Sequence, residues 1–212
     1  MKIIYALLLA SFSLSANANL ISIDLFSVGD NLVTKDTKTG LEWLDLTETQ
    51  NLSPRQILEG AGGWSANGFV YATTSQVTQL FLNSNNKATL TPPGEDVTEE
   101  NLKGALNLLD LLGTTYVQNC CNNFSIVGNG FAGINEPGLD LIYGAAFGTN
   151  LNSTAGFFSI QAGTFSTEFS DPFLGSYLVR SVSAVPLPAA APLFLSALGF
   201  MGFSAKFRKK KS

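Results

Sequence analysis

Apolar and polar residues alternate along the first part of the chain that follows residue 19. Residues 22–28 and 32–35 place apolar side chains at about every second position, and Gly29-Asp30-Asn31 separates them, which is typical of strands joined by a turn. A polar turn at 36–40 precedes a third alternating segment at 41–46. The pattern predicts two or three strands in a meander.

Two later segments begin with residues that favour a helix start. Ser53 with Gln56 three residues on forms a capping box, and Pro54 suits the first helical position. A second box runs from Thr73 to Gln76. The apolar face of this second helix would be formed by Val77, Leu80 and Phe81.

A third helix is predicted from Thr98 as its cap, with Glu99 and Glu100 at its positive end and Gly113 as its stop. Its apolar stripe would consist of Leu102, Ala105, Leu106 and Leu109. Between the second and third helices, residues 83–96 are expected to be a polar loop.

Short β segments return after the third helix and end at 176–182. The 20 glycines and the many Asn, Ser and Thr residues fit short strands with frequent turns. Residues 19–184 are long enough for one domain with its own core. We therefore predict an α+β domain of short antiparallel strands with about three helices.

The first 18 residues have the layout of a secretory signal peptide. Lys2 gives a positive start, residues 3–14 are apolar, and Ala16 and Ala18 form a small-x-small cleavage site. This predicts export by the Sec machinery and cleavage after Ala18.

The C-terminal end combines an uncharged apolar segment at 187–205 with a basic tail. The basic residues are Lys206, Arg208, Lys209, Lys210 and Lys211. As a helix the segment would reach ~28 Å, close to the ~30 Å hydrocarbon core, although Pro192 favours a later start and a shorter span. Basic clusters stay in the cytoplasm, so the exported domain would lie on the periplasmic side of the membrane.

Charge is unevenly distributed between the ends and the body of the chain. Lys2 and the tail hold half of the 12 basic residues, so the remaining six face all 16 acidic residues within the body. A domain with ten more acids than bases lacks the positive surface that nucleic acids require. We exclude nucleic-acid binding.

A five-residue motif precedes the apolar segment and overlaps its start: Val185, Pro186, Leu187, Pro188 and Ala189. With the helix and basic tail behind it, the region 185–212 resembles the VPLPA variant of the PEP-CTERM sorting signals, where the commonest variant has Pro-Glu-Pro. The resemblance implies a Gram-negative envelope protein that lies transiently in the inner membrane. It would be processed there by an exosortase, a membrane-embedded Cys-dependent enzyme. Surface or matrix localisation beside exopolysaccharide would follow. An ordinary single-pass anchor is the alternative.

Three further segments, 36–47, 68–80 and 177–180, are similar to exosortase-sorted surface proteins of no assigned activity. In the same order they resemble a surface domain related to C-type-lectin-like folds. That wider family has Gly-Trp-Arg-Leu-Pro-Thr in the middle segment and Cys-Val-Arg in the last. Here Phe69, Tyr71, Ala72 and Leu178 depart from those patterns.

Catalytic constellations are few, because the sequence contains no histidine. This removes Ser-His-Asp and Cys-His arrangements and the usual His-containing zinc sites. Glycosidase chemistry needs only two carboxylates, but Glu42 and Asp45 would point to opposite faces of a strand. We interpret Trp43 as core and Asp45 as an acid whose hydrogen bonds are satisfied within the fold. No catalytic residue and no enzymatic activity are predicted.

Cys120 and Cys121 are the only cysteines. In an oxidising compartment they leave three alternatives: a vicinal disulfide, two free thiols, or bonds to partner chains. Two thiols are too few for structural zinc. Acidic segments at 24–36 and 135–140 do not fit an EF-hand loop. We predict no metal and no cofactor.

The sequence thus favours a non-enzymatic structural or adhesive protein of the cell surface or matrix. A lectin-like module that binds polysaccharide is the alternative. A carboxylate-dependent glycoside hydrolase ranks lowest.

Overall fold

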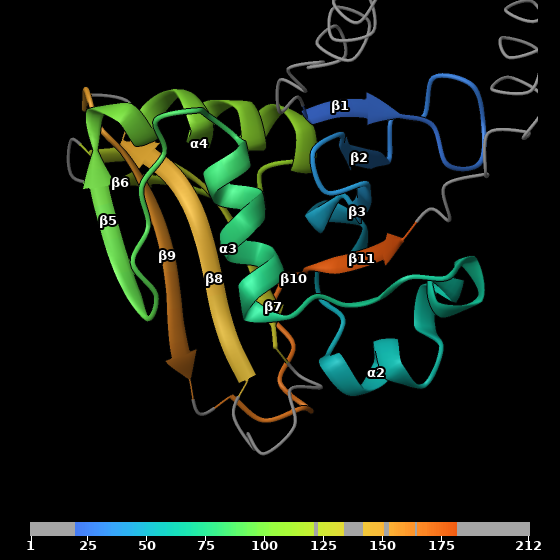
Figure 1. The fold of residues 1–212 in the computed structure, drawn as a ribbon. Coiled ribbons are helices and arrows are strands. Elements are labelled where there is room, and N and C mark those ends of the chain that lie inside the picture. Colours follow the sequence, from blue (N-terminus) through green and yellow to red (C-terminus); the bar gives the residue numbers. More distant parts are fainter. Residues whose placement is uncertain (1–19, 121–122, 134–141, 151–152, 164, 182–212) are drawn as a thin grey trace, which may run out of the picture. The chain divides into compact units, whose positions relative to one another are not determined.

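The computed structural model describes residues 20–120, 123–133, 142–150, 153–163 and 165–181. They form an α+β fold, as predicted, and its strands are arranged in two sheets (Figure 1). The chain divides into the units Met1–Ser181 and Val182–Ser212. The predicted signal peptide, sorting motif, C-terminal hydrophobic helix and basic tail all lie outside the described residues. Within those residues, every helix is too short or too polar to cross a bilayer.

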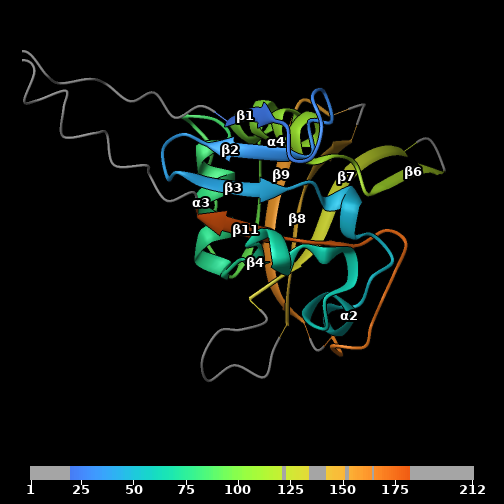
Figure 2. The ribbon, with the colours of Figure 1, turned by 90° about the vertical axis from the view of Figure 1, so that its right-hand side faces the viewer.

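The smaller sheet has five strands, all antiparallel to their neighbours, in the order β1-β2-β3-β11-β4. Figure 2 shows them from top to bottom in this order. Their bounds are Leu20–Ile23 for β1, Val33–Asp36 for β2, Leu41–Leu44 for β3, Leu178–Ser181 for β11 and Val70–Tyr71 for β4. The predicted meander corresponds to β1, β2 and β3.

The larger sheet has the order β10-β7-β8-β9-β5, and β6 pairs with β7. Only the β10–β7 pair is parallel among its described strands. The bounds are Gly94–Thr98 for β5, Tyr116–Cys120 for β6, Asn123–Ala132 for β7, Ile142–Asn150 for β8, Gly156–Gly163 for β9 and Gly175–Ser176 for β10. With eight to ten residues each, β7, β8 and β9 are longer than the predicted short strands.

The three predicted helices are confirmed as α2 (Pro54–Leu58), α3 (Thr74–Asn83) and α4 (Glu99–Leu112). Ser53 and Thr73 both close capping boxes. In α4 the Thr98 side chain accepts a hydrogen bond from the Asn101 backbone N–H. Three short 3₁₀ helices complete the described helical residues: η1 (Leu46–Thr49), η2 (Ala61–Gly63) and η3 (Ser65–Asn67).

Three details of the predicted elements are wrong. The first strand ends at Ile23, because the Asp30 carboxylate accepts backbone N–H groups and folds residues 24–32 into a loop. The predicted polar loop contains the start of β5. The apolar stripe of α4 is also shifted: Leu106 is 44% exposed, whereas Asn101 is fully buried and bonds to the backbone before the helix.

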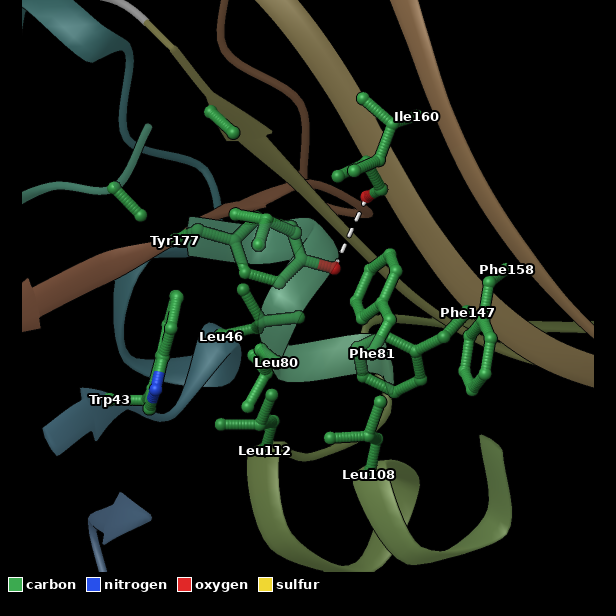
Figure 3. Close-up of a cluster of buried hydrophobic side chains, with 14 of the residues drawn as sticks. Trp43, Leu46, Leu80, Phe81, Leu108, Leu112, Phe147, Phe158, Ile160 and Tyr177 are labelled. Atoms are coloured by element: carbon green, nitrogen blue, oxygen red, sulfur yellow. Dashed lines mark hydrogen bonds between the residues drawn. The ribbon is translucent and has the colours of Figure 1, made fainter. Parts of the chain in front are cut away.

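The main hydrophobic core lies between the two sheets and the helices α3 and α4 (Figure 3). Phe81 of α3 stacks on Phe158 of β9, with ring centroids 5.0 Å apart, and meets Phe147 and Tyr177 edge-on. Trp43 contributes from the small sheet and is 1% exposed, so its assignment to the core is confirmed. This core fixes helices α3 and α4 against one face of the large sheet.

A second cluster of buried side chains includes Leu44 and Trp64 and places the α2 region against the small sheet. The segment from Gly175 to Ser181 then joins the sheets, since it supplies both β10 and β11. Gly175 is required there because a Cβ atom would collide with the Leu46 backbone.

Candidate functional site

Helices α3 and α4 cover only one face of the large sheet (Figure 1). Side chains alternate along each strand, so Phe147, Phe158 and Ile160 point into the core and their neighbours point the other way. We call this second side the open face. It carries a cavity of about 640 Å³, within the ~300–1,000 Å³ typical of ligand pockets.

A polar row crosses four strands of the open face. The strand register pairs Asn129 with Ala146, Ala146 with Ser159, and Ser159 with Glu95. All four residues line the cavity. The row therefore offers an amide, a hydroxyl and a carboxylate side by side, with the small Ala146 side chain as the floor between them.

A second row on each side flanks this polar row. One flanking row consists of Phe131, Gly144 and the polar Gln161, and the other includes the apolar Phe157 and Val97. The segment after β9 places Phe165 against Phe131, with ring centroids 5.5 Å apart and an interplanar angle of 69°.

Phe165 forms one wall of the cavity, and its ring lies directly over the backbone of Gly163. A Cβ atom at Gly163 would collide with the Phe165 ring. The ring therefore needs a glycine at this position in order to lie against the sheet. Phe165 is 40% exposed and is available to a ligand in the cavity.

The polar groups of the cavity have unused hydrogen-bonding capacity. The side chains of Asn129, Ser159, Gln161 and Glu95 form no hydrogen bond or ion pair with any described residue. The hydrogen bond between Asn129 and Thr115 uses the backbone N–H of Asn129, so its side-chain amide stays unpaired. Ser159 lacks a partner although the residue is largely buried, with only 6% of its surface exposed. Polar side chains that gather unpaired around a cavity are suited to bind a polar ligand.

The electrostatics of the cavity are simple. Glu95 is the only charged side chain among its described lining residues. A single carboxylate does not supply the pair that glycoside hydrolysis needs. The described lining thus combines hydrogen-bonding groups with one negative charge.

The sequence segments 36–47, 68–80 and 177–180 meet elsewhere, at the β3, β11 and β4 strands of the small sheet. Arg180 of β11 forms an ion pair with Glu42 of β3 at 2.8 Å and lies over the Phe69 ring, 4.7 Å from its centroid. Its guanidinium also donates to the Asn67 carbonyl at 3.2 Å. These three segments, which are far apart in the chain, thus form a packed structural cluster around Glu42, Phe69 and Arg180, which we call the motif cluster.

The prediction that the hydrogen bonds of Asp45 are satisfied within the fold is wrong. Its Oδ1 atom is buried, and no described residue provides a hydrogen-bond partner. Burial raises the pKa of Asp45 to about 7, and the negative charges of Glu48 and Asp30 act in the same direction. The carboxyl group is therefore mostly neutral below about pH 7, where an ordinary aspartate is ionised.

Other candidate residues have structural roles or lie outside the description. Asp30 accepts four backbone N–H groups, which lower its pKa to about 2, and Asp36 accepts the amide of Asn83 at 2.7 Å. Among the described residues, no three potential metal ligands cluster. Cys120 ends β6, but Cys121 lies outside the described residues, and so do the motif 185–189, the tail 206–211 and Ala16 and Ala18.

The open face was not predicted from the sequence, although β9 carries a signal for it. In residues 158–161, the apolar Phe158 and Ile160 alternate with the polar Ser159 and Gln161. Among the described residues, four phenylalanines are at least 40% exposed: Phe26, Phe165, Phe169 and Phe173.

Comparison with known proteins gives no relative: no family model, curated protein or solved structure matches this chain.

Proposed function

We propose that this chain is an exported, non-enzymatic surface protein sorted by an exosortase-type system. The observation that carries the proposal is the order of the signal-like N-terminus, the acidic domain, the VPLPA motif at 185–189, the apolar segment and the basic tail. On this proposal, the domain passes through the inner membrane with its body in the periplasm. It then reaches the cell surface or the extracellular matrix.

A C-type-lectin-like arrangement of the domain belongs to the same proposal. It is supported by the contact between the three motif segments, since Glu42, Phe69 and Arg180 come from separate parts of the chain. A fold alone does not name a ligand.

The second candidate function is binding of polysaccharide in the surface layer or matrix. It is favoured by one specific observation, the cavity on the open face with its unpaired amide and hydroxyl groups. Structural and binding roles are compatible, because a matrix protein can be held in place by the polymer it binds.

Intact mass spectrometry of the protein from a host with the matching exosortase tests the sorting proposal. We expect the mature protein to lack residues 1–18 and everything from the vicinity of Pro188 onward. In a matched host without the enzyme, the basic tail should remain and the protein should fractionate with the inner membrane. A variant with Pro186→Ala and Pro188→Ala should resemble the enzyme-free case.

Recovery of mature surface protein that still ends at Ser212 would refute processing. Recovery of the protein in the cytoplasm would refute export.

A further inference from the structure

We propose that the cavity on the open face is a binding subsite for an uncharged polysaccharide, with the polymer lying across β7, β8, β9 and β5. The inference rests on the proposed polysaccharide-binding function and specifies its site and ligand class. Three features support it: the direction of the polar row, the charge of the cavity and the exposed Phe165 ring at its wall.

The polar row gives the direction of the ligand. Neighbouring strands are ~4.8 Å apart, so a row across four strands extends ~14 Å. Asn129 lies at one end, Ser159 near the middle and Glu95 at the other end. Such a row can contact an extended polymer at several points, because each side chain can donate or accept hydrogen bonds with hydroxyl groups.

The charge of the site selects the ligand class. The cavity contains no positive side chain among its described lining residues, and its single charge is the Glu95 carboxylate. The exported body of the chain also has ten more acids than bases. Polymers rich in carboxylate, sulfate or phosphate would be repelled, whereas uncharged hydroxyl groups are suited to Asn129, Ser159 and Gln161.

An aromatic ring beside the polar row is suited to contact the apolar faces of a sugar. Sugar rings present C–H groups on their faces and hydroxyl groups at their edges. On one side of the row, Phe165 lines the cavity with a ring that is 40% exposed, and this ring packs edge-on against Phe131, which is only 1% exposed. A ligand that packs C–H groups on the Phe165 ring would bring its hydroxyl groups to the polar row.

A peptide is less suited to this surface. Extended peptides usually bind to the edge of a sheet, where free backbone groups continue the hydrogen-bonding ladder. The cavity instead lies over the middle strands β8 and β9, whose backbones are paired on both sides. Its recognition groups are therefore side chains.

Affinity electrophoresis of the full chain tests the proposal. The probes are the uncharged polymers dextran, laminarin and galactomannan, with the anionic polymers alginate and polygalacturonate for comparison. We expect retardation by at least one uncharged polymer and none by the anionic ones. Addition of an unfolded peptide such as denatured casein should not compete.

Matched variants locate the site. The double variant Asn129→Ala with Gln161→Ala should weaken binding about tenfold or more, since two hydrogen bonds to the ligand are lost. Gln118→Ala is its control, because Gln118 is exposed on the same side of the sheet but does not line the cavity. Phe165→Ala should also weaken binding, whereas Phe173→Ala, at an exposed ring outside the cavity, should not.

Each variant is compared with the wild type by its thermal unfolding midpoint, so that a folding defect is recognised. Ala146→Leu serves as a second approach: it fills the cavity floor without removing a polar group and should also abolish retardation. Binding that survives Asn129→Ala with Gln161→Ala and Ala146→Leu would overturn the site while leaving polysaccharide binding intact.

Three other results would overturn the inference: retardation by the anionic polymers alone, competition by casein, or no retardation of the wild type by any polymer. The last result would also remove the second candidate function. Exosortase processing, measured separately by mass, would be unaffected.

Discussion

Polar side chains are paired with each other in the motif cluster but unpaired on the open face. In the motif cluster, Glu42 and Arg180 are paired with each other, and Arg180 also packs on Phe69. On the open face, the Asn129 and Gln161 side chains have no partner among the described residues. The polar groups of the motif cluster thus stabilise the fold, while those of the open face are free to form hydrogen bonds with a ligand.

The largest expected difference in the free energy of unfolding is between substitutions at two adjacent residues of β9, one on the covered face of the large sheet and one on the open face. Phe158→Ala should reduce the free energy of unfolding by about 3–5 kcal/mol, because the ring is fully buried and stacks on Phe81. Phe157→Ala should cost only about 1 kcal/mol, since its half-buried ring lies on the open face. Urea denaturation measures both. Equal losses would show that the open face is packed like a core.

Removal of charge should also distinguish the two regions. Glu42→Gln should destabilise the protein by about 2 kcal/mol, because its carboxylate is buried and holds Arg180, whose side chain is 25% exposed. Glu95→Gln on the open face should change stability by less than about 0.5 kcal/mol. Chemical denaturation of both variants tests this prediction, and a comparable loss for Glu95→Gln would contradict the assignment of Glu95 as an unpaired residue.

Asp45 gives a smaller effect that depends on pH. Its pKa is about 7 in the fold and 3.8 as the reference value, so the folded state holds its proton over a range where the unfolded state has lost it. Stability should therefore fall as the pH rises from about 4 to 7. Asp45→Asn should remove this decrease and stabilise the protein at pH 8 by an amount on the order of 1–2 kcal/mol, with allowance for solvent screening.

Denaturation midpoints at pH 4.5, 6 and 8 measure the Asp45 effect. Asp30 is its control with the opposite sign, because its pKa of about 2 lies below the reference value. In the wild type, the ionised Asp30 stabilises the fold above about pH 4, and this contribution disappears as the pH falls toward 2. Asp30→Asn should therefore be less stable than the wild type above about pH 4. An Asp45→Asn variant with the pH profile of the wild type would contradict the assignment of the raised pKa.

The smallest expected effect concerns a helix cap. Thr73→Ala removes the side chain that accepts the Gln76 N–H at the start of α3 and should cost about 1 kcal/mol. Thr73→Ser should retain most of the stability, since it keeps the hydroxyl group. Thermal unfolding of the two variants checks this contribution, and an equal shift in both would assign the effect to the lost methyl group instead.

Local signals were sufficient for the helices but not for the candidate site. The starts of α2, α3 and α4 follow from capping residues next to them in the chain, so Ser53, Thr73 and Thr98 predicted them well. Leu106, expected on the apolar stripe, is exposed, whereas Asn101, which was not part of that stripe, is buried, because burial on α4 depends on the distant strand β9 and on the loop before the helix.

The polar row depends on the register of four strands. Ser159 pairs with Ala146 on one side and with Glu95 on the other, across separations that no local pattern specifies. The alternation within β9 shows that one side is polar. Which side remains uncovered is decided by the packing of α3 and α4.

The segment from Gly175 to Ser181 determines how the domain would respond to a pulling force applied beyond Ser181. Tension applied beyond Ser181 would first load β11, which lies between β3 and β4 rather than at an edge. The load would next reach Tyr177, which donates to Phe131 in the large sheet and accepts from Ala72. A pulled chain would therefore have to break hydrogen bonds in both sheets before the domain could unravel.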